Sequence, residues 1–359
     1  MAYTNIDKPS DYFNTITWTG SDSNGSRSFT GVGFQPDLVW SKSRTATYEH
    51  LLYDSVRTAG NNKELRSNST GAEGSYSNEN YGYLSSFDSD GFSTTIGSDA
   101  TYGNAYFNDE TPQTYVAWNW LAGGTAVSNT DGSITSSVSA NTTAGFSIVS
   151  YTGSPPVATV GHGLNAVPSF MILKERDAVS DWIVFHSSLA NNQYLDLNNT
   201  NAVATDTNVW NNTAPTSSVF TVGDYSYTNP SSRAMIAYCF AEKKGFSKFG
   251  KYTGNGSTDG TFVYTGFKPA WLMIKNIDNA SSSWIIHDNK RDTFNIAKKN
   301  LDAENSDSEA TLDRLDILSN GFKNRSTLGF NNTSTNTYIY MAFAESPFTT
   351  STGIPTTAR

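Results

Sequence analysis

The chain has 359 residues, with 24 Lys or Arg against 33 Asp or Glu, so its formal net charge at pH 7 is −9. This balance argues against a nucleic-acid-binding groove, because neutralising phosphates requires clustered basic side chains. Only 16% of the residues are charged while 13% are aromatic, so Ser, Thr, Asn and Gly carry the polarity. Such residues favour turns and strand faces over helix interiors. The composition predicts an all-β protein.

The sequence contains one cysteine, Cys239, which leaves no intrachain disulfide and no cluster of Cys and His for a structural zinc site. The stretch from Met1 to Lys8 lacks the apolar core that a secretory signal needs. No run of 18 apolar residues is present. We therefore expect no membrane insertion and folding in a cytoplasm.

An internal repeat is the most informative feature of the sequence. Three segments share a proline, a variable residue, four mostly apolar residues and a lysine; they are residues 36–42, 168–174 and 269–275. An aromatic-Thr-Gly triplet precedes each of them, at residues 18–20, 151–153 and 252–254. A Leu-led polar segment and then a closing apolar run follow each of them; these runs are residues 115–120, 235–240 and 338–343. Because the landmarks keep one order, we interpret the chain as three copies of one module.

The apolar runs within a module are short and are broken by Gly, Pro, Asn and Asp, which is typical of strands. About seven strands per module at this turn spacing predict an antiparallel, jelly-roll-like β-sandwich for each copy. Helix is expected only as a turn or two in the acidic stretch from Asp302 to Leu315.

The repeats also predict domain boundaries. We expect a first module with a short N-terminal arm over residues 1–124, a Ser/Thr/Gly-rich linker over 125–144, a second module over 145–243, a third module over 244–348 and a C-terminal tail over 349–359. The second and third modules join almost directly, so their relative orientation should be fixed.

Candidate catalytic groups are few. The four histidines, His50, His162, His186 and His287, share no aligned place in all three repeats, and no HExxH, GxSxG or P-loop string occurs. Structural or surface positions are therefore favoured over catalysis. Cys239 lies in an apolar run and is interpreted as a core residue. We predict no catalytic residue, no cofactor and no metal site.

Two charged patterns leave alternatives open. Asp54 with Arg57 and Asp288 with Arg291 recur at one spacing in the first and third copies. Each pair either binds a ligand or, as we favour, holds a loop by a charge-assisted hydrogen bond. The acidic residues within 302–309 permit a calcium loop. Solvated turns are favoured there, because Asp and Asn are ordinary turn residues.

Exposed tyrosines are the candidate ligand-binding residues, because aromatic rings on loops can stack on sugar faces. The best candidates are Tyr81 and Tyr83, in the run that begins at Tyr76, and the pair Tyr225 and Tyr227. Tyrosine also fills protein interfaces. At these positions we favour intermolecular contact over sugar binding.

Five segments of the sequence carry a resemblance to a known family; they are residues 34–40, 65–73, 89–92, 129–134 and 151–153. Over nearly its whole length the chain resembles an uncharacterised repeat domain of virion-associated proteins from marine tailed bacteriophages, which are labelled tail-fibre-like or structural. The resemblance implies a phage particle protein without known catalysis. It supplies no binding residues.

The sequence has no collagen-like or heptad stalk, so a compact protein fits its length better than a long tail fibre. We expect a non-enzymatic bacteriophage virion surface protein, made in the host cytoplasm and docked on the tail or, as a decoration, on the capsid. It would act as a homo-oligomer whose partners are other virion proteins. The alternative is a tail-fibre or adhesin protein for host attachment, whose tyrosines bind cell-surface polysaccharide. A polysaccharide depolymerase is disfavoured, because no spacing selects a pair of carboxylates.

Overall fold

The computed structural model describes residues 3–21, 25–75, 80–109 and 113–356. Over these residues the composition-based prediction is confirmed, because the protein is all-β and its strands pair antiparallel in five sheets. The one helical element in these ranges is a single 3₁₀ turn, Pro9–Asp11 (η1). No helix in this part of the chain is long and apolar enough to cross a membrane.

The first module forms two sheets. The four-stranded sheet has the order β1-β7-β3-β4, and the three-stranded sheet has the order β2-β6-β5. The bounds of these strands are β1 (Phe13–Thr19), β2 (Arg27–Thr30), β3 (Leu38–Ser43), β4 (Leu51–Asp54), β5 (Tyr83–Asp88), β6 (Gly91–Thr95) and β7 (Thr114–Trp120).

The second module has an eight-stranded sheet of order β15-β14-β13-β12-β17-β10-β9-β8 and a two-stranded sheet of β11 and β16. The bounds are β8 (Val127–Asn129), β9 (Ser136–Asn141), β10 (Phe146–Thr152), β11 (Ala158–Gly161), β12 (Phe170–Glu175), β13 (Ile183–His186), β14 (Gln193–Asp196), β15 (Ala204–Thr205), β16 (Val219–Val222) and β17 (Ala234–Phe240).

The third module is one eight-stranded sheet that nearly closes into a barrel, with the order β18-β25-β20-β21-β22-β23-β24-β19. The bounds are β18 (Ser247–Thr253), β19 (Phe262–Tyr264), β20 (Phe267–Asn276), β21 (Trp284–Asp288), β22 (Ala297–Asp302), β23 (Ala310–Leu318), β24 (Gly321–Asn324) and β25 (Thr337–Pro347).

All three modules share one strand order. The strand that opens each copy, β1, β10 or β18, pairs with the last strand, the last strand pairs with the strand after the repeated proline, and this strand pairs with the next. The register is also the same: three equivalent residues, Trp40, Ile172 and Met273, lie opposite Trp118, Tyr238 and Met341. The prediction of three related antiparallel β modules is therefore confirmed.

Two segments differ from the sequence-based expectation. Residues 125–144 form β8 and β9 rather than a separate linker, and β9 pairs with β10. A sheet ladder uses backbone groups, so a Ser- and Thr-rich composition does not prevent strand formation. The stretch from Asp302 to Leu315 forms no helix, because β22 ends at Asp302 and β23 starts at Ala310. Leu315 then packs into the core of the third module.

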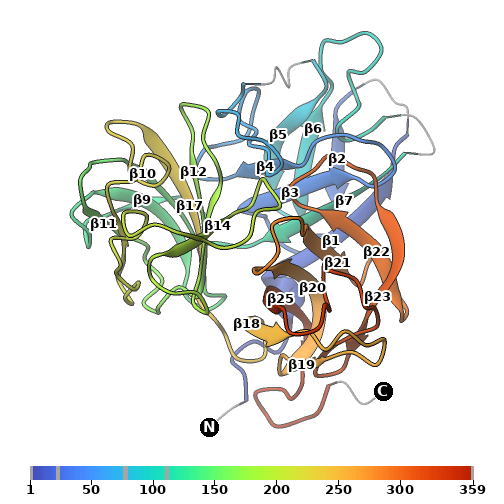
Figure 1. Cartoon of the computed structure of the whole chain (residues 1–359). Helices are drawn as coiled ribbons and strands as arrows, with labels where there is room; N and C mark the ends of the chain where they lie inside the picture. The colour runs from blue at the N-terminus through green and yellow to red at the C-terminus, as the bar shows by residue number, and fades with distance from the viewer. Residues whose placement is uncertain (1–2, 22–24, 76–79, 110–112, 357–359) are drawn as a thin grey trace.

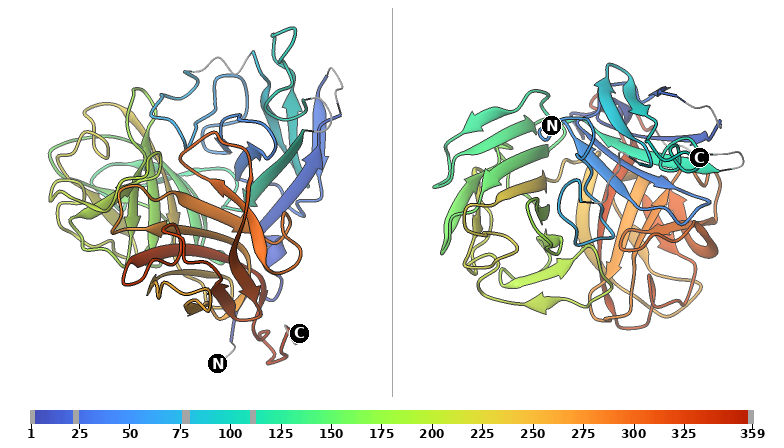
Figure 2. Two further views of the ribbon diagram at one scale, coloured as in Figure 1. Left: turned by 45° about the vertical axis from the view of Figure 1, so that its right-hand side comes forward. Right: turned by 90° about the horizontal axis from the view of Figure 1, so that it is seen from above.

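The three modules surround a common centre (Figures 1 and 2). Each module has buried residues of its own, and a further buried cluster draws on all three. In this shared cluster the last strands contribute three equivalent rings whose centroids lie 5.8 to 6.5 Å apart; they are Trp120, Phe240 and Phe343. Burying a large apolar side chain stabilises a fold by about 1.5–3 kcal/mol. The last strand of each module therefore depends on both neighbouring modules.

One backbone hydrogen bond recurs at all three module boundaries. The donor is a backbone N–H in the loop that follows the Leu-led segment of one module. The acceptor is a backbone carbonyl of the neighbouring module, two residues after its repeated lysine. The three bonds are Glu73 N to Arg176 O (2.9 Å), Val203 N to Ile277 O (2.9 Å) and Glu309 N to Arg44 O (2.7 Å). They join the first module to the second, the second to the third and the third to the first. The modules thus form a closed ring with pseudo-threefold symmetry.

The two ends of the described chain meet on one side of the ring (Figure 1). Asp7 accepts hydrogen bonds from the Ser351 backbone N–H at 2.6 Å and from the Ser351 hydroxyl at 2.5 Å. The third and first modules are not consecutive in the chain, so non-covalent contacts alone close the boundary between them.

A circular permutant should fold, because the ring needs its contacts and not its particular chain break. We expect a chain that is opened after Gly124, with its original ends joined through a Gly/Ser linker of about ten residues, to melt within about 5 °C of the wild type. Circular dichroism during heating measures this. The control permutant, opened between Leu173 and Lys174 inside β12, should not fold. Loss of structure in the first permutant alone would contradict ring closure by contacts.

Candidate functional site

The lysine that ends each repeated Pro-led segment is fully buried. Lys174 Nζ donates to Thr70 O of the first module at 3.0 Å, and Lys275 Nζ donates to Thr200 O of the second module at 3.1 Å. Lys42 Nζ donates to two carbonyls within its own module. Burial lowers the pKa of Lys42 to about 7 and the pKa of Lys174 and of Lys275 to about 8. The repeated lysine thus stabilises loops by hydrogen bonding to their carbonyls. In the second and third modules one of these carbonyls belongs to the preceding module.

The residue that opens or precedes the fourth strand of each copy makes the same contact at every boundary. Its ring nitrogen hydrogen-bonds the carbonyl of the second residue of the Leu-led segment in the neighbouring module. The three contacts are Trp182 Nε1 to Arg66 O (2.8 Å), Trp284 Nε1 to Asp196 O (2.9 Å) and His50 Nε2 to Asp302 O (3.1 Å). An imidazole therefore replaces an indole in a contact that closes the ring.

Three histidines, His50, His162 and His186, share one hydrogen-bonding pattern. In each, Nδ1 accepts from an N–H while Nε2 lies against a carbonyl oxygen, which fixes the neutral tautomer with its proton on Nε2. Burial lowers the pKa of all four histidines, to about 4 for His186 and to about 3 for His287. Burial likewise raises the pKa of the Cys239 thiol. These groups are placed to support structure rather than to exchange protons near neutral pH.

The first Asp–Arg pair lies at the boundary between the first and second modules. Asp54 Oδ2 accepts from Arg57 Nε at 2.5 Å and from the hydroxyl of Tyr238, in the second module, at 2.7 Å. Glu73 bonds Arg57 at 3.4 Å and Arg176, again in the second module, at 2.5 Å. The pair thus holds its loop against the neighbouring module.

The same charged network recurs between the third and first modules. Asp288 Oδ2 accepts from Arg291 Nε at 2.5 Å and from Trp118 Nε1 at 2.9 Å. Glu309 bonds Arg291 at 3.2 Å and Arg44 at 2.9 Å. Burial opposes ionisation of Asp288, but the Arg291 guanidinium outweighs it and lowers the pKa of this carboxyl. Glu309, one of the acidic residues that permitted a calcium loop, is therefore engaged with two arginines.

The boundary between the second and third modules carries none of these five polar groups. The equivalent positions hold His186, Leu189, Val203, Ile277 and Met341. The members of the network are replaced together, because a buried charge left without its partner costs several kcal/mol.

Replacing one member of a network should be far more harmful than replacing all of it. Arg291→Leu should lower the free energy of unfolding by about 3–5 kcal/mol, because the buried Asp288 carboxylate loses its partner. Converting the whole network by Arg44→Ile, Trp118→Met, Asp288→His, Arg291→Leu and Glu309→Val should recover most of that loss. Guanidinium denaturation measures both.

The control for this pair is Lys290→Leu, which removes an exposed charge beside the network and should change stability by less than about 0.5 kcal/mol. A fivefold variant no more stable than Arg291→Leu would contradict the interpretation.

A side-chain oxygen accepts the backbone N–H of the Trp or His residue in every module. The three bonds are His50 N to Asn68 Oδ1 (3.0 Å), Trp182 N to Asn198 Oδ1 (2.7 Å) and Trp284 N to Glu304 Oε2 (3.0 Å). The third module thus places a carboxylic acid where the others have an amide. Burial, aided by the charge of Asp302, raises the pKa of Glu304 to about 7.

This raised pKa predicts how stability varies with pH. Between pH 4.5 and about 7 the folded chain binds the Glu304 proton more tightly than the unfolded chain does. The tighter proton binding therefore adds up to about 3 kcal/mol to the free energy of unfolding. This stabilisation is fully present below pH 4.5 and is lost as the pH rises through 7. Glu304→Gln should remove this dependence and make the variant more stable than the wild type at pH 8. Urea denaturation at pH 5 and pH 8 measures the difference, with Glu345→Gln as the partly exposed control.

The predicted tyrosines Tyr225 and Tyr227 line a cavity of about 640 Å³, which we call the second-module pocket. Their ring centroids lie 5.5 Å apart at an interplanar angle of 78°, so the rings form a corner. The Tyr225 hydroxyl donates to the Tyr194 hydroxyl at 2.9 Å, and burial raises the pKa of Tyr225. Polar side chains complete the lining; they include Glu175, Asp206, Asn208, Asp224 and Arg233.

The predicted Tyr81 lines a cavity of about 340 Å³, which we call the first-module pocket, together with Tyr48, Tyr102, Ala105 and Tyr106. The rings of Tyr81 and Tyr106 meet edge to face at 5.6 Å. Sequence reasoning missed the other three tyrosines, because they come from separate loops that only the fold brings together.

Tyr83 lies elsewhere, in β5, where it packs against the core of the first module. All four predicted tyrosines are half-buried against the cores of their modules, and three of them, Tyr81, Tyr225 and Tyr227, also line cavities. Tyr76, which begins the tyrosine-rich run, lies outside the described residues.

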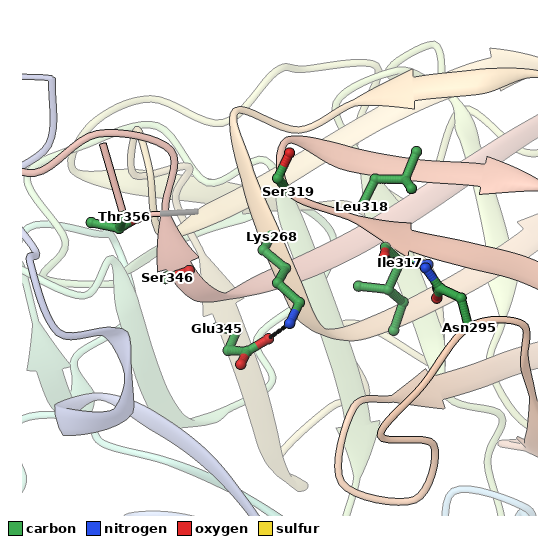
Figure 3. A pocket seen from close by; sticks show the side chains of 8 residues that line it. All are labelled: Lys268, Asn295, Ile317, Leu318, Ser319, Glu345, Ser346 and Thr356. Atoms are coloured by element: carbon green, nitrogen blue, oxygen red, sulfur yellow. Dashed lines mark hydrogen bonds and ion pairs between the residues drawn. The ribbon is translucent and has the colours of Figure 1, made fainter. Parts of the chain in front are cut away.

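A third cavity, of about 540 Å³, lies on the third module (Figure 3). Its charged groups, Lys268 and Glu345, pair at 2.6 Å, and the Asn295 side chain exchanges two hydrogen bonds with the Ile317 backbone. Because these polar groups already have partners, this cavity is a weaker candidate than the two tyrosine pockets. Within the described ranges, no group of three or more His, Cys, Asp or Glu side chains could hold a metal ion.

The fold defines an all-β chain in which three copies of one module close into a ring. The chain belongs to the family described as a domain of unknown function, DUF7483, which matches residues 8–347. One match thus spans all three modules. Neither the curated proteins nor the solved structures contain a significant match to the chain.

Proposed function

We propose that this protein is a non-enzymatic structural protein of a bacteriophage virion, docked on the surface of the capsid or tail as an oligomer. The resemblance of its repeats to virion-associated domains supports the proposal. One observation carries it: the buried polar groups contact other parts of the chain. The buried lysines, histidines and Asp–Arg pairs bind backbone and side-chain groups of neighbouring modules.

A ring of this kind suits a structural position. Each module contacts both others through aromatic packing, through backbone hydrogen bonds and at two boundaries through buried charges. Opening any one boundary breaks the aromatic packing and the backbone hydrogen bond of that boundary together, so the chain is expected to behave as one rigid body. A rigid body keeps its outer loops at fixed positions for contact with other particle proteins.

The copy number in purified particles tests this proposal. Quantitative mass spectrometry against a labelled standard of the full chain should give hundreds of copies per particle for a capsid protein. A tail protein should give roughly six to eighteen copies, as ring symmetry requires. Detection in infected cells with no copy in purified particles would contradict the proposal.

A second candidate function is attachment to the host through cell-surface polysaccharide. The observation that favours it is that Tyr81, Tyr225 and Tyr227, while half-buried against the cores of their modules, also line cavities. The purified chain should then be retained by host cells in a sedimentation assay. Equal recovery in the supernatant with and without cells would overturn it.

A further inference from the structure

The turn before the last strand has the same structure in all three modules. Each turn ends in an asparagine whose backbone N–H donates to the carbonyl four residues earlier. The side-chain oxygen of this asparagine accepts a hydrogen bond from the backbone N–H of the residue that follows the aromatic-Thr-Gly triplet. The asparagines are Asn108, Asn229 and Asn332. The aromatic residue of each triplet, Trp18, Tyr151 or Tyr252, donates to the carbonyl just before the asparagine. These turns are therefore equivalent positions of the repeat.

Two residues before each asparagine the turn carries an aromatic side chain: Tyr106, Tyr227 or Phe330. Tyr106 lines the first-module pocket and Tyr227 lines the second-module pocket. In the third module the Arg314 guanidinium lies 5.1 Å from the Phe330 ring centroid. The Arg66 guanidinium likewise lies 5.5 Å from the Tyr106 ring centroid, so the first and third copies both place an arginine against this ring. The two tyrosine pockets share this turn position, which Tyr106 occupies in the first copy and Tyr227 in the second.

We propose that the first-module and second-module pockets bind neutral hexopyranose units of a polysaccharide, an inference that rests on the second candidate function. A pyranose has one face of C–H groups, which packs on an aromatic ring, and a rim of hydroxyls, which need hydrogen-bond partners. The corner formed by Tyr225 and Tyr227 supplies the rings. Asp206, Asn208 and Asp224 supply polar groups on the same cavity wall.

The charge of the second-module pocket selects against acidic sugars. Its lining includes the carboxylates of Glu175, Asp206 and Asp224 against one guanidinium, Arg233. Arg233 already pairs with Glu175 at 3.0 Å, so the remaining charge is negative. A uronate, sialate or phosphate would meet like charge there. The acidic chain as a whole, at −9, acts in the same direction.

The dimensions of each pocket fit a few sugar units. The cavities, about 340 and 640 Å³, fall in the range of small-molecule sites, roughly 300–1,000 Å³. A polysaccharide chain that reaches both pockets binds twice, and such linkage can raise affinity by about 10²-fold or more over that for a single unit.

Affinity electrophoresis of the full chain tests the proposal, with dextran, galactomannan and laminarin as neutral probes and alginate as the anionic probe. We expect at least one neutral polymer to retard the chain and alginate to leave its mobility unchanged. Tyr227→Ala and Tyr102→Ala should each weaken retardation about tenfold, and the double variant should abolish it. Tyr227→Phe, which keeps the ring, should bind like the wild type.

The matched control is Phe330→Leu, at the equivalent position of the third module, which should bind like the wild type. Melting temperatures of all variants exclude unfolding as a cause. The proposal is overturned by unchanged mobility in all three neutral polymers, by retardation in alginate alone, or by a double variant that binds as the wild type does. Host cells that retain the double variant as well as the wild type would overturn these sites while leaving host attachment standing.

Discussion

The mutual contact of Trp120, Phe240 and Phe343 is the constraint on which the other features of the fold depend. Each ring comes from the last strand of a different module, β7, β17 or β25. That strand lies between the opening strand of its copy, β1, β10 or β18, and the strand of the repeated Pro-led segment, β3, β12 or β20. A module taken alone would expose this face to water. The sheets must therefore meet at one centre, and the loops at their ends are brought into reach of one another. The lysine, indole and backbone contacts at the boundaries follow from that arrangement.

The boundaries show two physical solutions to one packing problem. Around the first module, buried Asp, Arg and Glu side chains satisfy one another and the Tyr238 hydroxyl or the Trp118 indole. Between the second and third modules the equivalent positions hold the apolar Leu189, Val203, Ile277 and Met341, with His186 in place of the aspartate. A buried ion pair and an apolar replacement can be similar in stability, whereas a mixture of the two is not. The networks are thus present or absent as units.

Sequence reasoning predicted the repeats and the strands because both depend on local patterns of apolar residues, Pro and Gly. It could not predict the purpose of the lysines in 168–174 and 269–275, because each has a partner in a neighbouring module that only the fold brings near. His50 was not aligned with Trp182, since the two side chains share a hydrogen-bonding nitrogen but not a residue type. The strand at Ser136–Asn141 was missed because its ladder uses backbone groups. Tyr81 and Tyr83 differ in outcome because their environments are set by distant loops.

A ring of repeats within one chain differs in one respect from a trimer of identical chains. In a trimer every substitution appears three times, so a surface that suits one contact must suit all three. Here each copy changes independently while the centre keeps its geometry. One turn can carry Tyr227 beside a cavity while its counterpart carries Phe330 under an arginine. Joining the copies in one chain therefore lets the backbone and ring-nitrogen contacts that close the ring recur at every boundary, while the outer residues are free to specialise.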